Sequence, residues 1–359
     1  MMAFLKSHGV SIVGMSTAVP KNIVSVEEYA DKFGNEIVES FKKTTGINTM
    51  HRTNENQTAG DLGYSASDYL LKQLGVDREH IGVLVFVSQS PDYRRPATAC
   101  VLQYRLGLSR ECASFDINLG CSGFVYGNQI IRSTMMSCDA KYGLLIVAET
   151  SSKVTSADDK GLAMMFGDAG SAILYESGTC EMSKTLLETY GEGFKNIIAY
   201  AGGFRDINPL NKVFTVADGN KHSKFDVFMD GLAVFVFSIN EVPKAIKKFL
   251  LSSDENIELF DFIFLHQANH MIIKQIAKKM KFPLDKIPIS LDKFGNTSGV
   301  TIPLTICHAF GSKKLGKIRV LASGFGTGLS LGVTSFEMNT DNIFPIIETD
   351  EYFSEGKFL

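Results

Sequence analysis

The chain has 359 residues, of which 45% are apolar and 21% charged, and its net charge is −3 at pH 7. This length exceeds the size at which one hydrophobic core usually stops growing, so we expect two domains or two fused half-domains in an ordered globular protein. The small negative charge gives no global electrostatic reason to bind nucleic acid or an anionic membrane, which leaves small molecules and proteins as partners.

The N-terminus, MMAFLKSHGVSIVGMSTAVP, lacks the long apolar core and cleavage site of a secretory signal. No stretch reaches the roughly 18 consecutive apolar residues that a transmembrane helix needs. The six cysteines are scattered without CxxC pairs, unlike those of a disulfide-rich secreted domain. We therefore expect a cytoplasmic protein whose thiols are mostly buried and unpaired.

Short apolar runs rich in β-forming residues alternate with longer segments of helical period. The runs are IGVLVFV (81–87), CASFDIN (112–118), YGLLIVAE (142–149), FDFIFLH (260–266), KIPISL (286–291) and IRVLAS (318–323). Such alternation predicts an α/β protein with at least partly parallel sheets. Several runs are apolar on both faces, as sandwiched central strands require.

The order of these runs occurs twice. Cys121 lies 33 residues after Ser88, and Asn296 lies 30 residues after His266; in both cases another predicted strand follows 26 residues later. Both Cys121 and Asn296 follow a β-like run and a glycine, so each should lie at a strand-to-helix turn, at equivalent points of two similar halves. Coincidence among α/β elements is the alternative.

The boundary between the halves should lie near 175–190. We expect an N-terminal half, 1–180, that carries the cysteine, and a C-terminal half, 181–338, that carries the histidine and the asparagine. The acidic segment 339–359 contains a proline and no long amphipathic pattern. It is predicted to be a loosely held surface tail rather than a segment docked over the site.

Cys121 is the cysteine placed to react. In DINLGCSGF (116–124), flanking glycines permit a tight turn, and the following residues can form a helix. A thiol at a helix N-terminus faces the positive end of the dipole, which should lower its pKa from about 8.5. The alternative is a small buried hydrophobic residue.

His266 ends a predicted strand, so its ring should emerge at the edge where α/β proteins bind ligands. A neutral imidazole there can stabilise a thiolate or donate a hydrogen bond to an oxyanion; the alternative is a core histidine. His266 and His270 have the i, i+4 spacing of helical metal sites. No third ligand is evident, and His266 should precede the helix, so we expect no metal.

Asn296, in LDKFGNTSGVTIPLT (291–305), can present an amide donor to a carbonyl oxygen. A helix cap is the alternative for this residue. In GFGTGLSLG (324–332), glycines follow a predicted strand. Because LSLGVTSFEM reads as another strand, we expect a hairpin that offers a backbone oxyanion donor, not a nucleotide-binding loop.

These motifs carry a resemblance: over about residues 8–338 the chain resembles β-ketoacyl-acyl carrier protein synthase III and its relatives in the thiolase superfamily. DINLGCSGF, HQAN (266–269), GNTSGVTIP (295–303) and GFGTGLSLG match in order and spacing. The resemblance implies an α/β thiolase fold of five layers, αβαβα, built from two similar halves and usually found as a homodimer.

The resemblance also implies roles for residues. Cys121 would take an acyl group from an acyl-coenzyme A or acyl-carrier-protein thioester, after which a malonyl thioester would lose CO2 and attack the acyl-enzyme. His266 and Asn296 would hold the malonyl thioester carbonyl, and the N–H groups of Cys121 and Thr327 would form the oxyanion hole. No bound cofactor is implied.

Two departures from the family pattern concern the donor. In ESFKKTTGI (39–47), Ser40 and Thr44 stand where initiation enzymes carry a tryptophan and an arginine for coenzyme A, and the chain has no tryptophan. Met271 replaces an arginine associated with carrier-protein docking. These changes favour a specialised relative over the housekeeping initiation enzyme.

Other functions remain open beside decarboxylative condensation. The same three residues can serve acyl transfer to oxygen or nitrogen, or non-decarboxylative condensation. A non-catalytic scaffold and a Cys-His hydrolase are further alternatives. A biosynthetic thiolase is disfavoured because the glycine turn has no second cysteine to act as a base.

Overall fold

Two long strands run through the computed structural model, which describes residues 3–210, 212–215, 219 and 221–356. They are β1 (Ala3–Pro20) and β7 (Ala169–Thr189), which pair antiparallel. Their register shifts beside Gly9 (φ +77°), and Gly178 has φ +85°. Glycine adopts this conformation without the strain of a Cβ, so both strands can bend here. The half-domain boundary suggested at 180/181 falls within β7, close to this bend.

Each end of β7 belongs to a different set of strands. Residues 169–176 pair with β6, which is followed by β4 and β5, all three parallel. Residues 184–189 pair with β14, which is followed by β13 and β12. The bounds are β4 Ile81–Val87, β5 Ala113–Ile117, β6 Tyr142–Glu149, β12 Phe262–Leu265, β13 Lys317–Gly326 and β14 Ser330–Asn339. The two halves therefore share β1 and β7.

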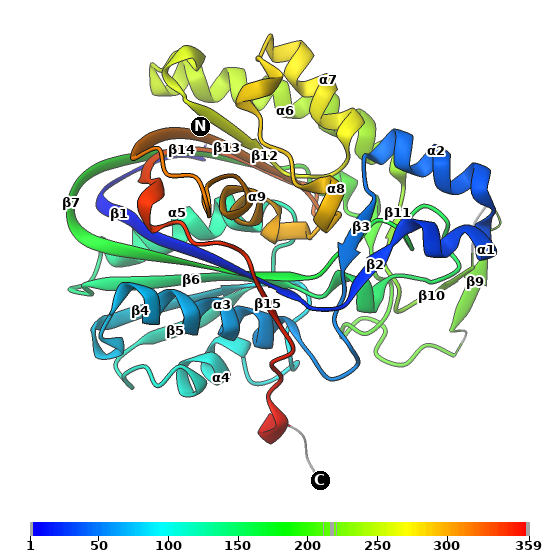
Figure 1. Ribbon diagram of the computed structural model, residues 1–359, viewed down its shortest axis with the longest axis horizontal. Helices are drawn as coiled ribbons and strands as arrows, with labels where there is room; N and C mark the ends of the chain where they lie inside the picture. Colours follow the sequence, from blue (N-terminus) through cyan, green and yellow to red (C-terminus); the bar gives the residue numbers. More distant parts are fainter. Residues whose placement is uncertain (1–2, 211, 216–218, 220, 357–359) are drawn as a thin grey trace.

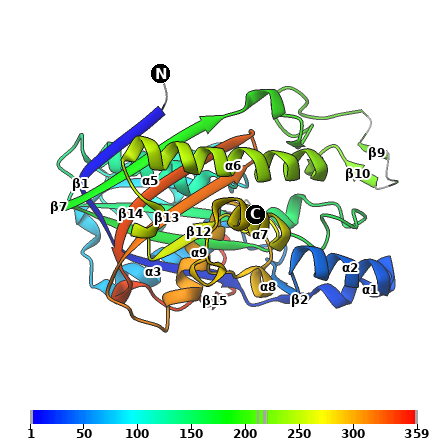
Figure 2. The same cartoon turned by 90° about the horizontal axis from the view of Figure 1, so that it is seen from above.

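Helices lie between the two sets of strands and on both outer faces (Figures 1 and 2). Helices α5 and α9 fill the middle, α3 and α4 cover the β4–β6 side, and α6 and α7 cover the β12–β14 side. The bounds are α3 Ala59–Leu74, α4 Thr98–Arg105, α5 Gly123–Met135, α6 Gly231–Ser253, α7 His270–Met280 and α9 Thr301–Phe310. This is the five-layered thiolase arrangement predicted from the sequence.

Shorter elements gather at one end of the molecule, on the right in Figure 1. Strands β2 and β3 pair with each other, as do β9 with β10 and β8 with β11. The bounds are β2 Ile23–Ser25, α1 Ala30–Phe33, α2 Asn35–Thr45, β3 Thr49–His51, β8 Ile197–Ile198, β9 Val213–Thr215, β10 Lys221–Ser223, β11 Phe228–Met229 and α8 Leu291–Phe294.

Five of the six predicted strands form, but 286–291 does not. This run lies between a short 3-10 turn and α8. Pro288 has no N–H to give to a ladder, and the N–H of Ser290 donates to the side chain of Gln267 at 3.3 Å. Consequently Asn296 lies in a turn between two helices, and the strand-to-helix turn predicted for it is wrong. Cys121 does lie between β5 and α5, as predicted.

The C-terminal segment docks on the N-terminal half, so the prediction of a loosely held tail is wrong. Strand β15 (Ile347–Thr349) pairs with the end of β1, and the amide of Gln57 donates to the carbonyl of Thr349 at 3.1 Å. The Phe353 ring lies 4.6 Å from the guanidinium carbon of Arg105, a favourable cation–π contact. Residues 357–359 lie outside the described residues.

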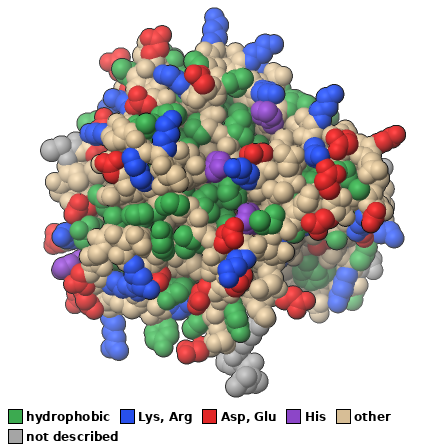
Figure 3. Space-filling model, in the orientation of Figure 1, with side chains coloured by type: hydrophobic (Ala, Val, Ile, Leu, Met, Phe, Trp, Pro, Cys, Tyr) green, Lys and Arg blue, Asp and Glu red, His purple; other side chains and the backbone are tan. Residues whose placement is uncertain are grey.

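Within the described ranges, no helix is both long enough and apolar enough to cross a bilayer. On the face shown in Figure 3, acidic and basic side chains are interspersed. Mixed charges of this kind do not build the extended positive field that attracts nucleic acid.

Candidate active site

A cavity of about 1250 Å³ lies at the carboxyl ends of the central strands. Its walls include residues just beyond β4, β5, β12 and β13, the place where α/β proteins commonly bind ligands. Cys121, His266, Asn296 and Thr327 all line it. The structure therefore brings together the four residues that the sequence singled out.

Cys121 is held at the base of the cavity by close backbone packing. The N–H of Gly123 donates to the carbonyl of Gly120 at 2.6 Å, which forms the tight turn before α5. The end of β13 presses against the thiol: a Cβ on Gly326 would lie 2.8 Å from the sulfur. Glycine at 326 is therefore needed for β13 to approach the thiol.

Burial sets the ionisation of Cys121. It raises the pKa of the thiol above its ordinary value, against the opposing effect of the N–H of Thr327 and the hydroxyl of Ser298. The lowering predicted from the helix N-terminus is not found, because the 9%-exposed side chain has lost most of its solvation. The resting form is therefore the thiol.

We expect the alkylation rate of Cys121 by iodoacetamide to keep rising through pH 9. The thiolate is the nucleophile, and below a raised pKa its fraction grows about tenfold per pH unit. The rate should be followed on the Cys121 peptide, with Cys121→Ala as background because Cys100 and Cys138 are exposed. A plateau reached below pH 8 would contradict the raised pKa.

His266 follows β12 directly, and its backbone N–H donates to the carbonyl of Ser323 at 2.9 Å. Burial lowers the pKa of its imidazole to about 3, so the ring is neutral at physiological pH. Nδ1 lies 2.7 Å from the hydroxyl of Thr301. His270 begins α7, so His266 precedes the helix as predicted. Among the described residues, no three His, Cys, Asp or Glu side chains are grouped as metal ligands.

Asn296 is fixed by its backbone and its side chain. Its N–H donates to the carbonyl of Met165 at 3.0 Å, and its carbonyl accepts from the N–H of Gly167 at 3.2 Å. Its side-chain Oδ1 accepts from the N–H of Ser298 at 2.9 Å. Because Oδ1 is already engaged, the amide NH2 group is the part that can donate to a ligand in the cavity.

The matching family models are those described as 3-oxoacyl-[acyl-carrier-protein (ACP)] synthase III, over residues 115–191, and its C terminal, over residues 252–338. The chain is 32% identical over 328 residues to a β-ketoacyl-[acyl-carrier-protein] synthase III of Clostridium perfringens, with 91% of this chain and 98% of that protein covered. The chain belongs to the 3-oxoacyl-[acyl-carrier-protein] synthase III family.

Two further relatives agree with this assignment. A putative 3-oxoacyl-[acyl-carrier-protein] synthase 3 of Campylobacter jejuni is 31% identical over 343 residues, covering 92% of this chain and 96% of that protein. The crystal structure of a 3-oxoacyl-(acyl-carrier protein) synthase from Burkholderia xenovorans LB400 superposes with a TM-score of 0.91 at 33% identity, covering 97% of this chain and 99% of that chain.

Two positions of this synthase III family member were missed by reasoning from its sequence. Ser298 lies next to Cys121, with 3.9 Å between Oγ and Sγ, and Thr301 contacts His266. Both belong to the segment NTSGVT (296–301), in which the sequence pattern singles out Asn296 alone. The recurrence of hydroxyl residues around Asn296 was the only signal that the sequence offered.

Glu149, at the end of β6, is a third cavity residue that the sequence did not single out. Burial raises the pKa of its carboxyl to about 8, although the hydroxyl of Ser90 and the N–H of Gln89 donate to it at 2.8 and 3.0 Å. At neutral pH it is therefore mostly uncharged. In this uncharged form, Glu149 places no negative charge in the cavity that it lines together with Cys121.

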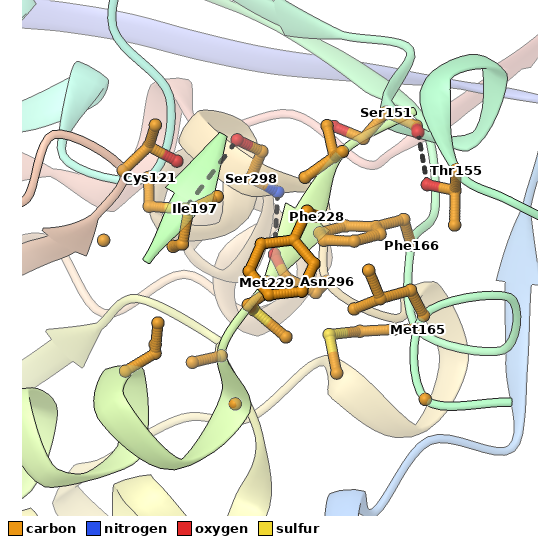
Figure 4. A pocket seen from close by; sticks show the side chains of 18 of the residues that line it. Cys121, Ser151, Thr155, Met165, Phe166, Ile197, Phe228, Met229, Asn296 and Ser298 are labelled. Atoms are coloured by element: carbon orange, nitrogen blue, oxygen red, sulfur yellow. Dashed lines mark hydrogen bonds between the residues drawn. The ribbon is translucent and has the colours of Figure 1, made fainter. Parts of the chain in front are cut away.

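Apolar side chains also line the cavity. Figure 4 shows Met165, Phe166, Ile197, Phe228 and Met229 around Asn296 and Ser298. Side chains of this kind exclude water and favour the burial of an alkyl chain.

The departures from the family pattern lie at or near the cavity. Ser40 and Thr44 line it from α2. Met271 is 42% exposed near the start of α7.

Proposed function

We propose that the chain catalyses a decarboxylative condensation in which Cys121 carries the acyl group. One observation carries this proposal: the buried thiol, a neutral imidazole and a free amide donor open into the same cavity, from Cys121, His266 and Asn296. Family membership supports the reaction class. The thiol supplies the nucleophile for the first half-reaction, and the imidazole and the amide supply hydrogen-bond donors for the second.

In the first half-reaction, the sulfur of Cys121 attacks the carbonyl of an acyl thioester. The N–H groups of Cys121 and Thr327 donate to the oxygen of the tetrahedral intermediate. In the resting site, both N–H groups stabilise negative charge on the Cys121 sulfur and so lower the pKa of the thiol. The bond from the carbonyl carbon to the donor sulfur breaks. The donor leaves as a thiol that carries the proton lost by Cys121.

In the second half-reaction, a malonyl thioester loses CO2, and the resulting enolate attacks the acyl carbonyl on Cys121. The new carbon–carbon bond displaces the cysteine sulfur as a thiolate, which takes up a proton from solvent. Asn296 and His266 hold the thioester oxygen as enolate charge develops. In the resting contacts the single proton of the Thr301 hydroxyl goes to the carbonyl of Ser298, so Nδ1 of His266 donates to that hydroxyl. His266 becomes a donor from Nε2 when Thr301 turns its proton to Nδ1 instead.

The donor is an acyl-coenzyme A or an acyl-carrier-protein thioester, and no bound cofactor takes part. At the mouth, Ser40 and Thr44 cannot stack on an adenine as a tryptophan can. This supports a specialised role rather than chain initiation from acetyl-coenzyme A.

We also propose a homodimer in the cytoplasm. Strand β5 lies at one end of the strand order and is hydrogen-bonded to β4 on one side. Such an edge can pair with the same edge of a second copy about a two-fold axis.

The proposal is tested by intact-protein mass spectrometry after incubation with a panel of acyl-coenzyme A and acyl-carrier thioesters. We expect one acyl adduct on the wild type and none on Cys121→Ala, and the adduct names the donor. Native spectra of the same samples should show a dimer. No adduct with any thioester on a folded dimer would refute the acyl-enzyme, while release of free acid without an acceptor would identify a hydrolase.

A further inference from the structure

Ser298 contacts all three of the residues assigned to catalysis, directly or through one hydroxyl. Its N–H donates to Oδ1 of Asn296 at 2.9 Å, and its Oγ lies 3.9 Å from Sγ of Cys121. Its carbonyl oxygen accepts from the hydroxyl of Thr301 at 3.0 Å, and that hydroxyl lies 2.7 Å from Nδ1 of His266. Figure 4 shows Ser298 between Cys121 and Asn296, with both of its contacts drawn.

The backbone of Ser298 has an unusual conformation that serves this placement. Its φ is +53°, in the left-handed region that side chains other than glycine rarely adopt. Strain of this kind persists where the surroundings hold it, and it clusters at functional sites. Here the contacts with Asn296 and Thr301 hold the residue, and the result is a hydroxyl that faces the nucleophile.

The hydroxyl of Ser298 faces a sulfur that is largely removed from solvent. Cys121 is buried, and Ser298 is 7% exposed and lines the cavity. A hydroxyl can accept from a thiol and donate to a thiolate by rotating its proton, so it can follow the charge of the sulfur. Besides the backbone N–H groups, it is one of two side-chain groups, with Thr327, that favour the charged sulfur.

We propose that Ser298 is a fourth catalytic residue, whose hydroxyl donates a hydrogen bond to the sulfur of Cys121 as that sulfur becomes negatively charged. This occurs when the thiol attacks the donor thioester and again when the sulfur is displaced by the enolate. No bond is formed or broken at Ser298. This role in the half-reactions rests on the proposed function, whereas the hydrogen bond to the thiolate does not.

Other titratable groups could affect the same sulfur. Glu149 and His266 share the cavity, and burial keeps both mostly uncharged at neutral pH. The remaining titratable side chains that line it are Glu36, Asp159, Lys160 and His222. The test must therefore compare variants that leave all of these in place.

Two variants remove the Ser298 hydroxyl and differ in how well the new residue tolerates the positive φ. Ser298→Ala keeps the Cβ at the strained φ, and Ser298→Gly relieves the strain. In both, we expect the alkylation of Cys121 by iodoacetamide to shift to higher pH and to slow about ten- to hundredfold at pH 7.5, as for loss of a hydrogen bond to a charged group. Acylation by the thioester should slow in parallel. CO2 release from a malonyl thioester, without an acyl donor, should change by less than about threefold.

Thr297→Ala is the matched control, because it removes a buried neighbouring hydroxyl that has no partner among the described residues. It should leave alkylation, acylation and CO2 release unchanged. A wild-type alkylation profile in Ser298→Ala or Ser298→Gly would overturn the proposal. So would an equal loss of acylation and CO2 release in both, which would make Ser298 a structural residue only. The alkylation readout needs no thioester, so it stands even if the condensation activity proves wrong.

Discussion

Gly326→Ala should abolish acylation of Cys121, with a fall of at least ~1000-fold in the rate of adduct formation. A Cβ at this position would lie 2.6 Å from Cβ and 2.8 Å from Sγ of Cys121, well inside van der Waals contact. Neither backbone can shift, because Gly326 ends β13 with its ladder to β14 and Cys121 stands in the tight turn before α5. The side chain of Cys121 must therefore turn away, which moves the sulfur out of its position beside the N–H of Thr327.

The matched control is Gly316→Ala. Gly316 (φ +71°) has positive φ, as Gly326 (φ +153°) has, but a Cβ at Gly316 would meet nothing within 4 Å. It should cost about 1 kcal/mol of unfolding free energy from backbone strain and leave acylation intact. If Gly326→Ala folds and still acylates at a tenth of the wild-type rate or faster, the fit of β13 against the thiol is not essential.

The strands that could be predicted from the sequence are those buried on both faces. The runs at 81–87 and 142–149 coincide with β4 and β6, because an uninterrupted apolar run has few other ways to bury itself. The run at 286–291 (KIPISL) is also rich in apolar residues, yet Pro288 has no N–H for a ladder and the N–H of Ser290 donates to the side chain of Gln267. The local sequence does not reveal this hydrogen-bond partner, because Gln267 lies outside the run. The bend of β1 and β7 depends likewise on pairings across the whole chain.

The positions of two cavity residues could be predicted because glycines mark the turns that carry them. Cys121 and Thr327 both lie beside such glycines. Ser298 could not, because its role depends on a contact across 177 residues of sequence. The direction of the Cys121 pKa shift was missed for the same reason: the helix N-terminus is a local feature, whereas the burial that outweighs it is built by distant segments such as β13.

Asn296→Asp should separate the two half-reactions. The substitution keeps the oxygen that accepts from the N–H of Ser298, so the turn should fold as before. It replaces the NH2 donor with an oxygen, which faces the enolate with a lone pair or a charge. We expect CO2 release from a malonyl thioester to fall about 100- to 1000-fold, the usual cost of losing one oxyanion donor. Adduct formation on Cys121 should stay within about threefold of the wild type.

The pH dependence of the Asp variant adds a second check. Asn296 is 5% exposed, so a carboxyl in its place would resist ionisation. Only the protonated carboxyl can donate a hydrogen bond, and its population falls as pH rises. Residual CO2 release in Asn296→Asp should therefore decrease with increasing pH, whereas that of Asn296→Ala should remain low without this trend.

Cys121→Ala provides the opposite pattern for comparison. It removes the acyl acceptor but leaves Asn296 and His266 in place, so CO2 release should persist while adduct formation is lost. Both half-reactions can be followed on the same preparations, by intact mass and by trapped CO2, beside a thermal melt that reports on folding. If Asn296→Asp melts like the wild type and yet loses acylation as severely as CO2 release, Asn296 serves the thiol rather than the enolate, and the division of roles proposed for this cavity is wrong.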